Sequence, residues 1–261
     1  MKAAMGDRQH RVKMGYAQVR KMFAPESWRC KVLFALATAG AVSAAAGQDL
    51  LVVAPQLAKV EYEDARVRVV RLHIPEHASL PTHERPRRVV VSLSANHVQL
   101  AHLDGTTSVT RTEAGSVAWS EPAVRSVTNL GAAVENIVVE LKQAVDPAIA
   151  VANPPATLPA TYLNDPWHPW ALENQYVRVY DVRIPPGVTT SFHQHAYDQI
   201  AVFVSGGLVS VQSEGQPWGQ PKTIEPRGVE FAADAAKPVT HRVRNDGTSE
   251  YHVVLVQFLR E

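Results

Sequence analysis

The most restrictive feature of this 261-residue chain is an internal repeat. Residues 67–75 (VRVVRLHIP) recur as residues 177–185 (VRVYDVRIP), which lie 110 positions further along. The same offset carries His83 onto His193. Two copies of one pattern in a chain of this length predict two similar domains in tandem, each built on the same arrangement of elements.

Apolar and polar residues alternate in short runs through both copies. Residues 88–91 and 137–139 are examples, and Asp104 with Gly105 forms a strong turn signal between such runs. After residue 46, no segment keeps a helical period of useful length. Many short strands separated by turns predict an all-β sandwich or barrel, whose interior holds side chains or one small ligand.

Composition divides the chain into four parts. Residues 1–46 combine eight Lys or Arg with a short apolar run ending in three alanines, which is the pattern of a signal peptide. Residues 146–165 are rich in proline, which excludes a helix interior or a central strand. We therefore expect a signal peptide at 1–46, an N-terminal domain at 47–145, a linker at 146–165 and a C-terminal domain at 166–261.

The expected leader determines the expected compartment and partners. It predicts a periplasmic or secreted protein. The apolar run is shorter than a bilayer span, so membrane contact is expected only through a leader that stays uncleaved. Cys30, the only cysteine, lies within it, so disulfides and thiolate chemistry are not expected in the mature chain. No basic run is interleaved with aromatics, which argues against a nucleic-acid partner.

Three histidines of the second copy predict a metal site. His193 and His195 lie two residues apart in a predicted strand, so both imidazoles point to the same face. His241 lies in a later strand-like segment. Neutral imidazoles aimed at one point are typical of transition-metal sites. The alternative is that these histidines only form hydrogen bonds inside the barrel.

These residues also carry a resemblance to the cupin family. The first cupin motif, G-x5-H-x-H-x3,4-E-x6-G, is matched by Gly187, His193, His195, Gln199 and Gly206, with Gln199 in place of the usual Glu. The second motif is matched more loosely, by Gly228, His241 and Asn245. Together with the repeat, the resemblance implies a bicupin: two tandem double-stranded β-helix (jelly-roll) barrels after the signal segment.

The resemblance implies that His193, His195, Gln199 and His241 bind one divalent transition metal. This donor set suits Fe, Mn, Ni, Cu or Zn and does not select among them. An amide at Gln199 leaves the full charge of the ion, which predicts weaker binding and a stronger Lewis acid. Alternatively, Gln199 does not ligate, and its position is open to water or substrate.

The first repeat has a different set of residues at the matching positions. A fixed offset, with Asn129 aligned to Asn245, gives His83, Arg85, Val89 and Arg125. Guanidinium groups stay protonated and cannot ligate a metal, so none is expected in the N-terminal domain. In the plainer interpretation the arginines pair with Glu84 or Glu121. In the other, His83, Arg85 and Arg125 form an anion-binding pocket.

The remaining histidines receive a structural interpretation. We expect residues 167–170 (WHPW) to plug the second barrel or the interface between domains. Five further histidines are expected to be structural, because they are scattered, lie next to turns, or lie on a strand that could direct them to either face: His73, His77, His97, His102 and His252.

Three functions stay open. Cupins with a three-histidine site resemble dioxygenases and isomerases that act on small oxygen-bearing molecules, so the first hypothesis is a metal-dependent enzyme. The sequence shows no evident catalytic base for it. The second hypothesis is a non-catalytic protein that binds a small molecule or a metal. The third is a structural module that packs its barrels together or forms a homodimer. Retention of all three histidines argues against the third.

Overall fold

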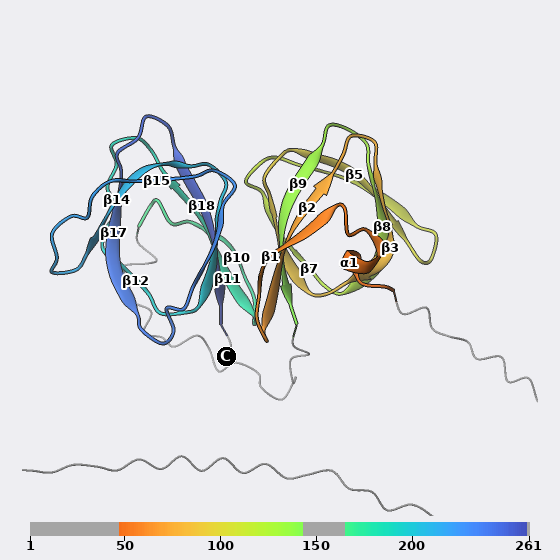
Figure 1. The fold of residues 1–261 in the computed structure, drawn as a ribbon, viewed down its shortest axis with the longest axis horizontal. Helices are drawn as coiled ribbons and strands as arrows, with labels where there is room; N and C mark the ends of the chain where they lie inside the picture. The colour runs from red at the N-terminus through yellow and green to blue at the C-terminus, as the bar shows by residue number, and fades with distance from the viewer. Residues whose placement is uncertain (1–46, 143–164, 260–261) are drawn as a thin grey trace, which may run out of the picture. The chain divides into compact units, whose positions relative to one another are not determined.

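The computed structural model describes residues 47–142 and 165–259 (Figure 1). These residues are almost entirely β, with one short helix, α1 (Leu50–Val53). In the described part of the chain, no helix is long and apolar enough to cross a membrane. The predicted leader and nearly all of the predicted linker lie outside the described residues. The expectation of an all-β fold is confirmed.

The first barrel follows α1 and consists of two antiparallel sheets. Its strands are β1 (Ala58–Glu63), β2 (Val67–Ile74), β3 (Ser79–Arg85), β4 (Arg88–Ser92), β5 (Asn96–His102), β6 (Thr107–Thr112), β7 (Val117–Ser120), β8 (Ala123–Asn129) and β9 (Val134–Leu141). One sheet has the strand order β1-β2-β9-β4-β7 and the other β3-β8-β5-β6.

The second barrel repeats this arrangement strand for strand. Its strands are β10 (Trp170–Glu173), β11 (Val177–Ile184), β12 (His193–His195), β13 (Gln199–Phe203), β14 (Gly207–Ser213), β15 (Lys222–Ile224), β16 (Val229–Ala232), β17 (Val239–Asn245) and β18 (Tyr251–Phe258). The sheet orders are β10-β11-β18-β13-β16 and β12-β17-β14-β15. The two orders are those of the first barrel, so the repeat in sequence is a repeat in topology.

A buried asparagine occupies the same place in each barrel. The side-chain amide of Asn129 donates to the carbonyl oxygen of Ile74 at 3.2 Å, and that of Asn245 donates to the carbonyl oxygen of Ile184 at 2.8 Å. Each amide oxygen also accepts a hydrogen bond from the backbone N–H two residues later. Both side chains are therefore fully used in fixing the turn that leads to the final strand.

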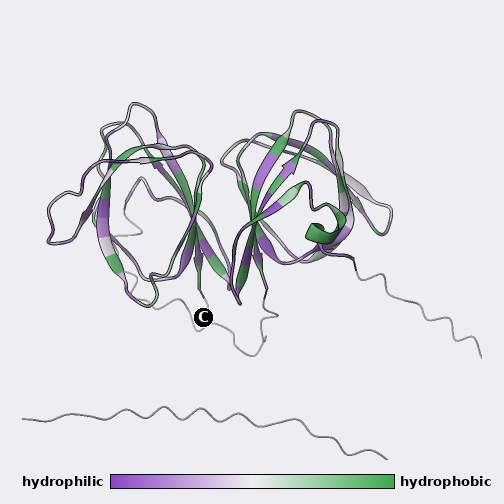
Figure 2. Cartoon of the chain, in the orientation of Figure 1, coloured by the Kyte–Doolittle hydropathy of each residue, from purple (hydrophilic) through white to green (hydrophobic). Residues whose placement is uncertain are grey.

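Hydrophobic and hydrophilic residues are interleaved along the strands of both barrels (Figure 2). Alternation of this kind gives each strand one face toward the barrel interior and one face away from it. In the first barrel, Leu50 and Ala54 from the α1 segment pack with interior residues such as Leu80 and Val127. In the second barrel, the interior cluster includes Tyr180, and no helix contributes to it.

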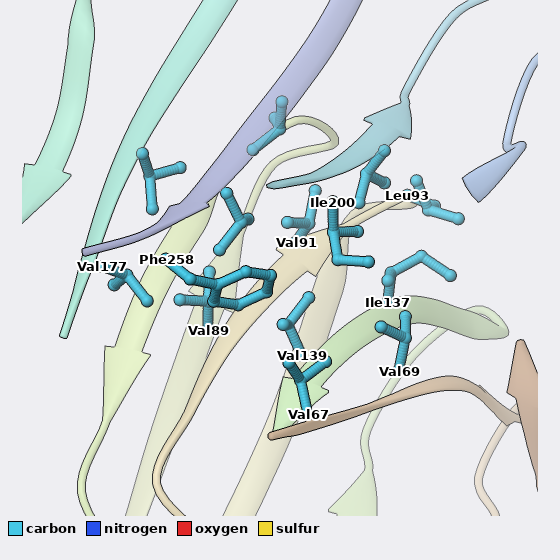
Figure 3. Packing of buried hydrophobic residues seen from close by; sticks show 14 residues of the cluster. Val67, Val69, Val89, Val91, Leu93, Ile137, Val139, Val177, Ile200 and Phe258 are labelled. Carbon is cyan, nitrogen blue, oxygen red and sulfur yellow. The ribbon is translucent and has the colours of Figure 1, made fainter. Parts of the chain in front are cut away.

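A single apolar core joins the outer faces of the two barrels (Figure 3). The first barrel contributes Val67, Val69, Val89, Val91, Leu93, Ile137 and Val139. The second contributes Val177, Val179, Ile200, Val202, Val254, Val256 and Phe258. Short β-branched side chains on flat strand faces pack closely, and we call this cluster the interface core.

Polar and aromatic contacts surround the interface core. The guanidinium of Arg66 donates to the Asp198 carboxylate at 2.8 Å. The rings of Tyr62 and Phe231 stack with their centroids 4.5 Å apart. His252, on β18, is buried and hydrogen-bonded to Asp181, in keeping with the structural role expected of it. The barrels therefore meet through an apolar centre with a polar rim, like a stable protein interface.

The interface core predicts a large cost for truncating its central residues. Ile200 is fully buried there, so Ile200→Ala is expected to lower the free energy of unfolding by about 2–5 kcal/mol, from lost transfer energy and the cavity left behind. Chemical denaturation measures the change. The matched control, Val109→Ala on the exposed face of β6, is expected to shift it by about 0.5 kcal/mol or less. Equal effects of the two substitutions would contradict the packing described.

Candidate metal centre

Strand pairing explains why the three predicted histidines meet. β12 pairs with β17, and His193 lies directly opposite His241 in the register. The period of two places His193 and His195 on the inner face of the barrel, where both are buried. All three residues offer a ring nitrogen within 4.8 Å of the others. The structure thus brings together the imidazoles that the sequence singled out.

The positions of the ring nitrogens fit a metal ion. Nε2 of His195 lies 3.1 Å from Nε2 of His241, and a metal held at about 2.1 Å from each imidazole nitrogen separates neighbouring ligand nitrogens by about 3 Å. Nδ1 of His193 lies 3.0 Å from the carbonyl oxygen of Ser191. Donation to that carbonyl puts the ring proton on Nδ1 and the lone pair on Nε2, an arrangement common for metal-binding histidines.

The electrostatic environment keeps the imidazoles neutral. Burial, together with the neighbouring imidazoles, lowers the pKa of His193, His195 and His241 to about 3 in each case. Because these pKa values lie far below neutral pH, each ring keeps a lone pair for coordination. A divalent cation would compensate for the buried, converging lone pairs.

Gln199 contacts the triad through His195. Its side-chain amide nitrogen lies 2.6 Å from Nδ1 of His195 and 2.8 Å from Oδ2 of Asp234. His195 faces His241 through Nε2 and contacts Gln199 through Nδ1. In this arrangement Gln199 orients the ring of His195, a predicted metal ligand. With the amide turned over, its oxygen would accept from Nδ1–H, which leaves Nε2 of His195 for a metal. Ligation by Gln199 itself stays a prediction.

Asp165 and His168 extend the site beyond the predicted set. The His168 ring lies 4.3 Å from that of His193 between centroids, and its Nδ1 lies 3.5 Å from Oδ2 of Asp165. Asp165 also accepts from the backbone N–H groups of Trp167 (3.0 Å) and Ser191 (2.9 Å). Burial alone would raise the pKa of Asp165, but His168 and these N–H groups hold it below its usual value. Asp165 is therefore a buried carboxylate that fixes the His168 ring.

Sequence reasoning missed this pair for a local reason. Asp165 and His168 precede β10, so neither lies on a strand whose period of two could predict its direction. Composition assigned Asp165 to the linker, and His168 was expected only as part of a plug. The available signal was an Asp and a His three residues apart, with Pro166 and Trp167 between them, shortly before the second copy of the repeat.

The triad and His168 line a cavity of 510 Å³ inside the second barrel. Apolar side chains such as Val182, Val253 and Leu255 form much of its wall. Its polar lining includes Glu230 and Lys222 in addition to the groups already described. A cavity of this size, largely apolar with a few convergent polar groups, is typical of small-molecule sites.

The strand register of the first barrel corrects one predicted equivalence. Arg88 lies opposite Glu140 of β9, as Gln199 lies opposite Gln257 of β18. Arg88, and not Val89, therefore occupies the Gln199 position, because the first barrel has one residue fewer between β3 and β4 than a fixed offset assumes. Val89 points the other way and belongs to the interface core.

The remaining equivalences agree with the sequence alignment, but the expected ion pairs do not form. Arg125 lies opposite His83, as His241 lies opposite His193. Glu121 instead accepts hydrogen bonds from Arg87 (3.1 Å) and Trp119 (2.7 Å).

No ion pair joins Arg85 or Arg125 to Glu84 or Glu121 in the part of the chain that the structure describes. The pairing expected in the plainer interpretation was therefore wrong.

Comparison with solved structures identifies the fold. AerE from Microcystis aeruginosa matches with a TM-score of 0.51 and 14% identity, over 78% of this chain and 98% of that one. A cupin 2 conserved barrel domain protein from Leptotrichia buccalis matches with a TM-score of 0.47 and 8% identity, over 77% and 88%.

A mutant of the salicylate 1,2-dioxygenase from Pseudoaminobacter salicylatoxidans matches with a TM-score of 0.48 and 9% identity, over 74% of this chain and 71% of that one. No family model matches the chain, and no curated protein matches it in sequence. At these identities the likeness concerns the fold alone, and the repeated sheet topology confirms the predicted pair of tandem β-barrels.

Metal content tests the triad directly. Protein purified without chelator is expected to contain close to one divalent transition metal per chain by elemental analysis. His193→Ala is expected to lose it, because one of three converging nitrogens is removed. His73→Ala, at an exposed position on β2, serves as the control and is expected to keep it. Equal metal content in the two variants, or none in the unmodified protein, would contradict this assignment.

A second substitution separates ligation by Gln199 from orientation of His195. Gln199→Met keeps the volume but removes the three hydrogen bonds of the amide, to His195, Asp234 and Gln257. If Gln199 orients His195, the variant should still bind one metal with about 10–100-fold lower affinity. The d–d spectrum of the Co²⁺-loaded protein should then keep its band positions, since the ligand atoms are unchanged. A shift of those bands would instead assign Gln199 as a ligand.

Proposed function

We propose that this chain, a bicupin, binds one divalent transition metal through His193, His195 and His241 and acts as an enzyme on a small oxygen-bearing molecule. The observation that carries the proposal is the convergence of three neutral imidazoles on the wall of a 510 Å³ cavity. The bound ion would supply Lewis-acid or oxygen-activating chemistry. A dioxygenase or an isomerase is the reaction class that we favour.

The Asp165–His168 pair supplies the proton-transfer group that the sequence did not reveal. With Nδ1 of His168 turned toward the Asp165 carboxylate, Nε2 is the nitrogen that exchanges a proton with a bound substrate. The carboxylate stabilises the imidazolium that forms when His168 accepts a proton. Asp165 also holds the backbone N–H of Ser191, whose carbonyl accepts from His193, so one carboxylate positions both groups.

The walls of the cavity indicate the kind of substrate. Val182, Val253 and Leu255 would contact an apolar part of the molecule, while the histidines would contact its oxygen atoms. The volume limits the substrate to a small molecule. Export from the cytoplasm is a further part of the proposal and is supported by the basic and apolar pattern of residues 1–46.

A second candidate function is non-catalytic binding of a metal or a small molecule. The amide at Gln199 favours it, because without a carboxylate ligand the site keeps the full charge of the ion and binds an anionic ligand more tightly. In this case the second barrel would bind the small molecule or the metal without converting it to a product. Turnover distinguishes the two candidates.

His168 provides the test of catalysis. The metal-loaded protein is screened for oxygen uptake and isomerisation with small hydroxy and keto compounds. For any substrate found, His168→Asn is expected to lower kcat by about 10²–10⁴-fold while metal content stays at one per chain. His73→Asn is the control and should leave both unchanged. Tight binding of such compounds without turnover would support the binding protein and overturn the enzyme.

A further inference from the structure

The interior of the first barrel holds three guanidinium groups at the positions of the metal site in the second. Arg85, Arg88 and Arg125 take the places of His195, Gln199 and His241, as the register shows. Figure 1 shows a barrel of the same kind in each half of the described chain. One scaffold therefore directs a converging set of side chains inward in both barrels, and in the first barrel the set is cationic.

Each of these guanidinium groups has a buried nitrogen donor that lacks an acceptor; Arg88 is buried as a whole residue, and Arg85 and Arg125 are half-buried. Nη1 of Arg85, Nε of Arg88 and Nε of Arg125 are all inaccessible and unpaired. Arg88, only 1% exposed, donates to the Pro86 carbonyl and the Ser120 hydroxyl, both at 3.2 Å, and these acceptors are neutral. Buried charged donors without partners are rare, because each costs more than a lost neutral hydrogen bond.

The carboxylates nearby do not balance the charge. Arg68 pairs with Glu140 and with Asp49, both at 2.6 Å. Both of these carboxylates are therefore already shared with a fourth guanidinium. We call Arg68, Arg85, Arg88 and Arg125 the arginine cluster. Four guanidinium groups against two carboxylates leave two positive charges in excess, since a buried, neutral His83 adds none.

Burial and neighbouring positive charge lower the pKa of two members of the arginine cluster. Burial, followed by the charges of Arg88 and Arg125, lowers the pKa of Arg85 to about 8. Burial and the charge of Arg125 lower the pKa of Arg88 to about 10. A bound anion would reverse these effects, because it supplies the missing acceptors and the missing negative charge together.

The surroundings restrict the size and access of such an anion. Leu50 and Ala54 of the α1 segment fill part of the barrel interior, which restricts any ligand beside the guanidinium groups to a small molecule. A cleft of 580 Å³ reaches Arg85 from outside and is also lined by Arg87 and Lys142. Both of these cations are paired, Arg87 with Glu121 at 3.1 Å and Lys142 with Glu63 at 2.6 Å, and Glu84 also lines the cleft, so the cleft offers access without adding free positive charge.

We propose that the first barrel binds a small dicarboxylate at Arg85, Arg88 and Arg125. A dianion matches the excess of two positive charges. Planar carboxylates accept the paired N–H donors of a guanidinium group, which a spherical anion cannot do as well. Neutral His83 does not donate to the ligand, because its ring proton lies on Nδ1, which donates to the Pro81 carbonyl at 2.7 Å.

The test uses the full chain carrying His193→Ala, so that an anion cannot bind through a metal in the second barrel. Malonate, acetate and sulfate are titrated at constant ionic strength, by calorimetry and by thermal denaturation. Malonate is expected to bind and to raise Tm with its concentration. Arg85→Met and Arg125→Met should each weaken malonate binding about tenfold or more. Arg111→Met, at an exposed position on β6, should leave it unchanged.

The stability of the ligand-free variants gives an independent readout. Removing one unpaired cation relieves repulsion, so Arg85→Met is expected to raise Tm without anion and to reduce the malonate-dependent rise. Circular dichroism checks that both variants fold.

Absence of malonate binding in the unmodified first barrel, or binding that Arg85→Met and Arg125→Met leave intact, would overturn the proposal. Equal binding of sulfate would overturn its assignment to dicarboxylates. None of these results depends on a metal in the second barrel.

Discussion

Each barrel depends on one antiparallel pairing between strands from opposite ends of its sequence. β2 pairs with β9 along its whole length, and β11 pairs with β18 in the same way. The late strand then also pairs with β4 or β13, so three strands form the centre of one sheet. This pairing fixes which residues of β4 and β13 face inward, and it sets the register that brings Arg88 and Gln199 to their sites.

The two interiors show how far the chemistry of one scaffold can differ. In the second barrel, burial and mutual proximity keep three imidazoles neutral, which suits them to a cation. In the first, the same burial acts on guanidinium groups, which keep their charge and lack acceptors. The sign of the ligand that each cavity favours follows from this difference between imidazole and guanidinium.

Much of the fold and the centre of the metal site could be predicted from the sequence. The repeat and the alternation of apolar residues predicted two β-barrels, and the spacing of His193 and His195 predicted their shared direction. Arg88 was missed because a fixed offset does not account for the connection between β3 and β4, which is one residue shorter than that between β12 and β13. Asp165 and His168 were missed because a segment between strands has no period from which to infer direction. The contact of Gln199 with Nδ1 of His195 depends on side-chain torsions, which sequence spacing does not specify.

The alternating faces of β4 and β13 have a consequence for how such a chain can diverge. Val89 and Ile200 pack in the interface core, while their neighbours Arg88 and Gln199 face opposite interiors. A larger side chain on the outer face of one barrel would require a smaller side chain on the facing surface of the other, because the two faces pack together in one interface core. The inner faces carry no such mutual constraint. Duplicated barrels joined in this way can therefore exchange one set of ligands for another while their shared surface stays unchanged.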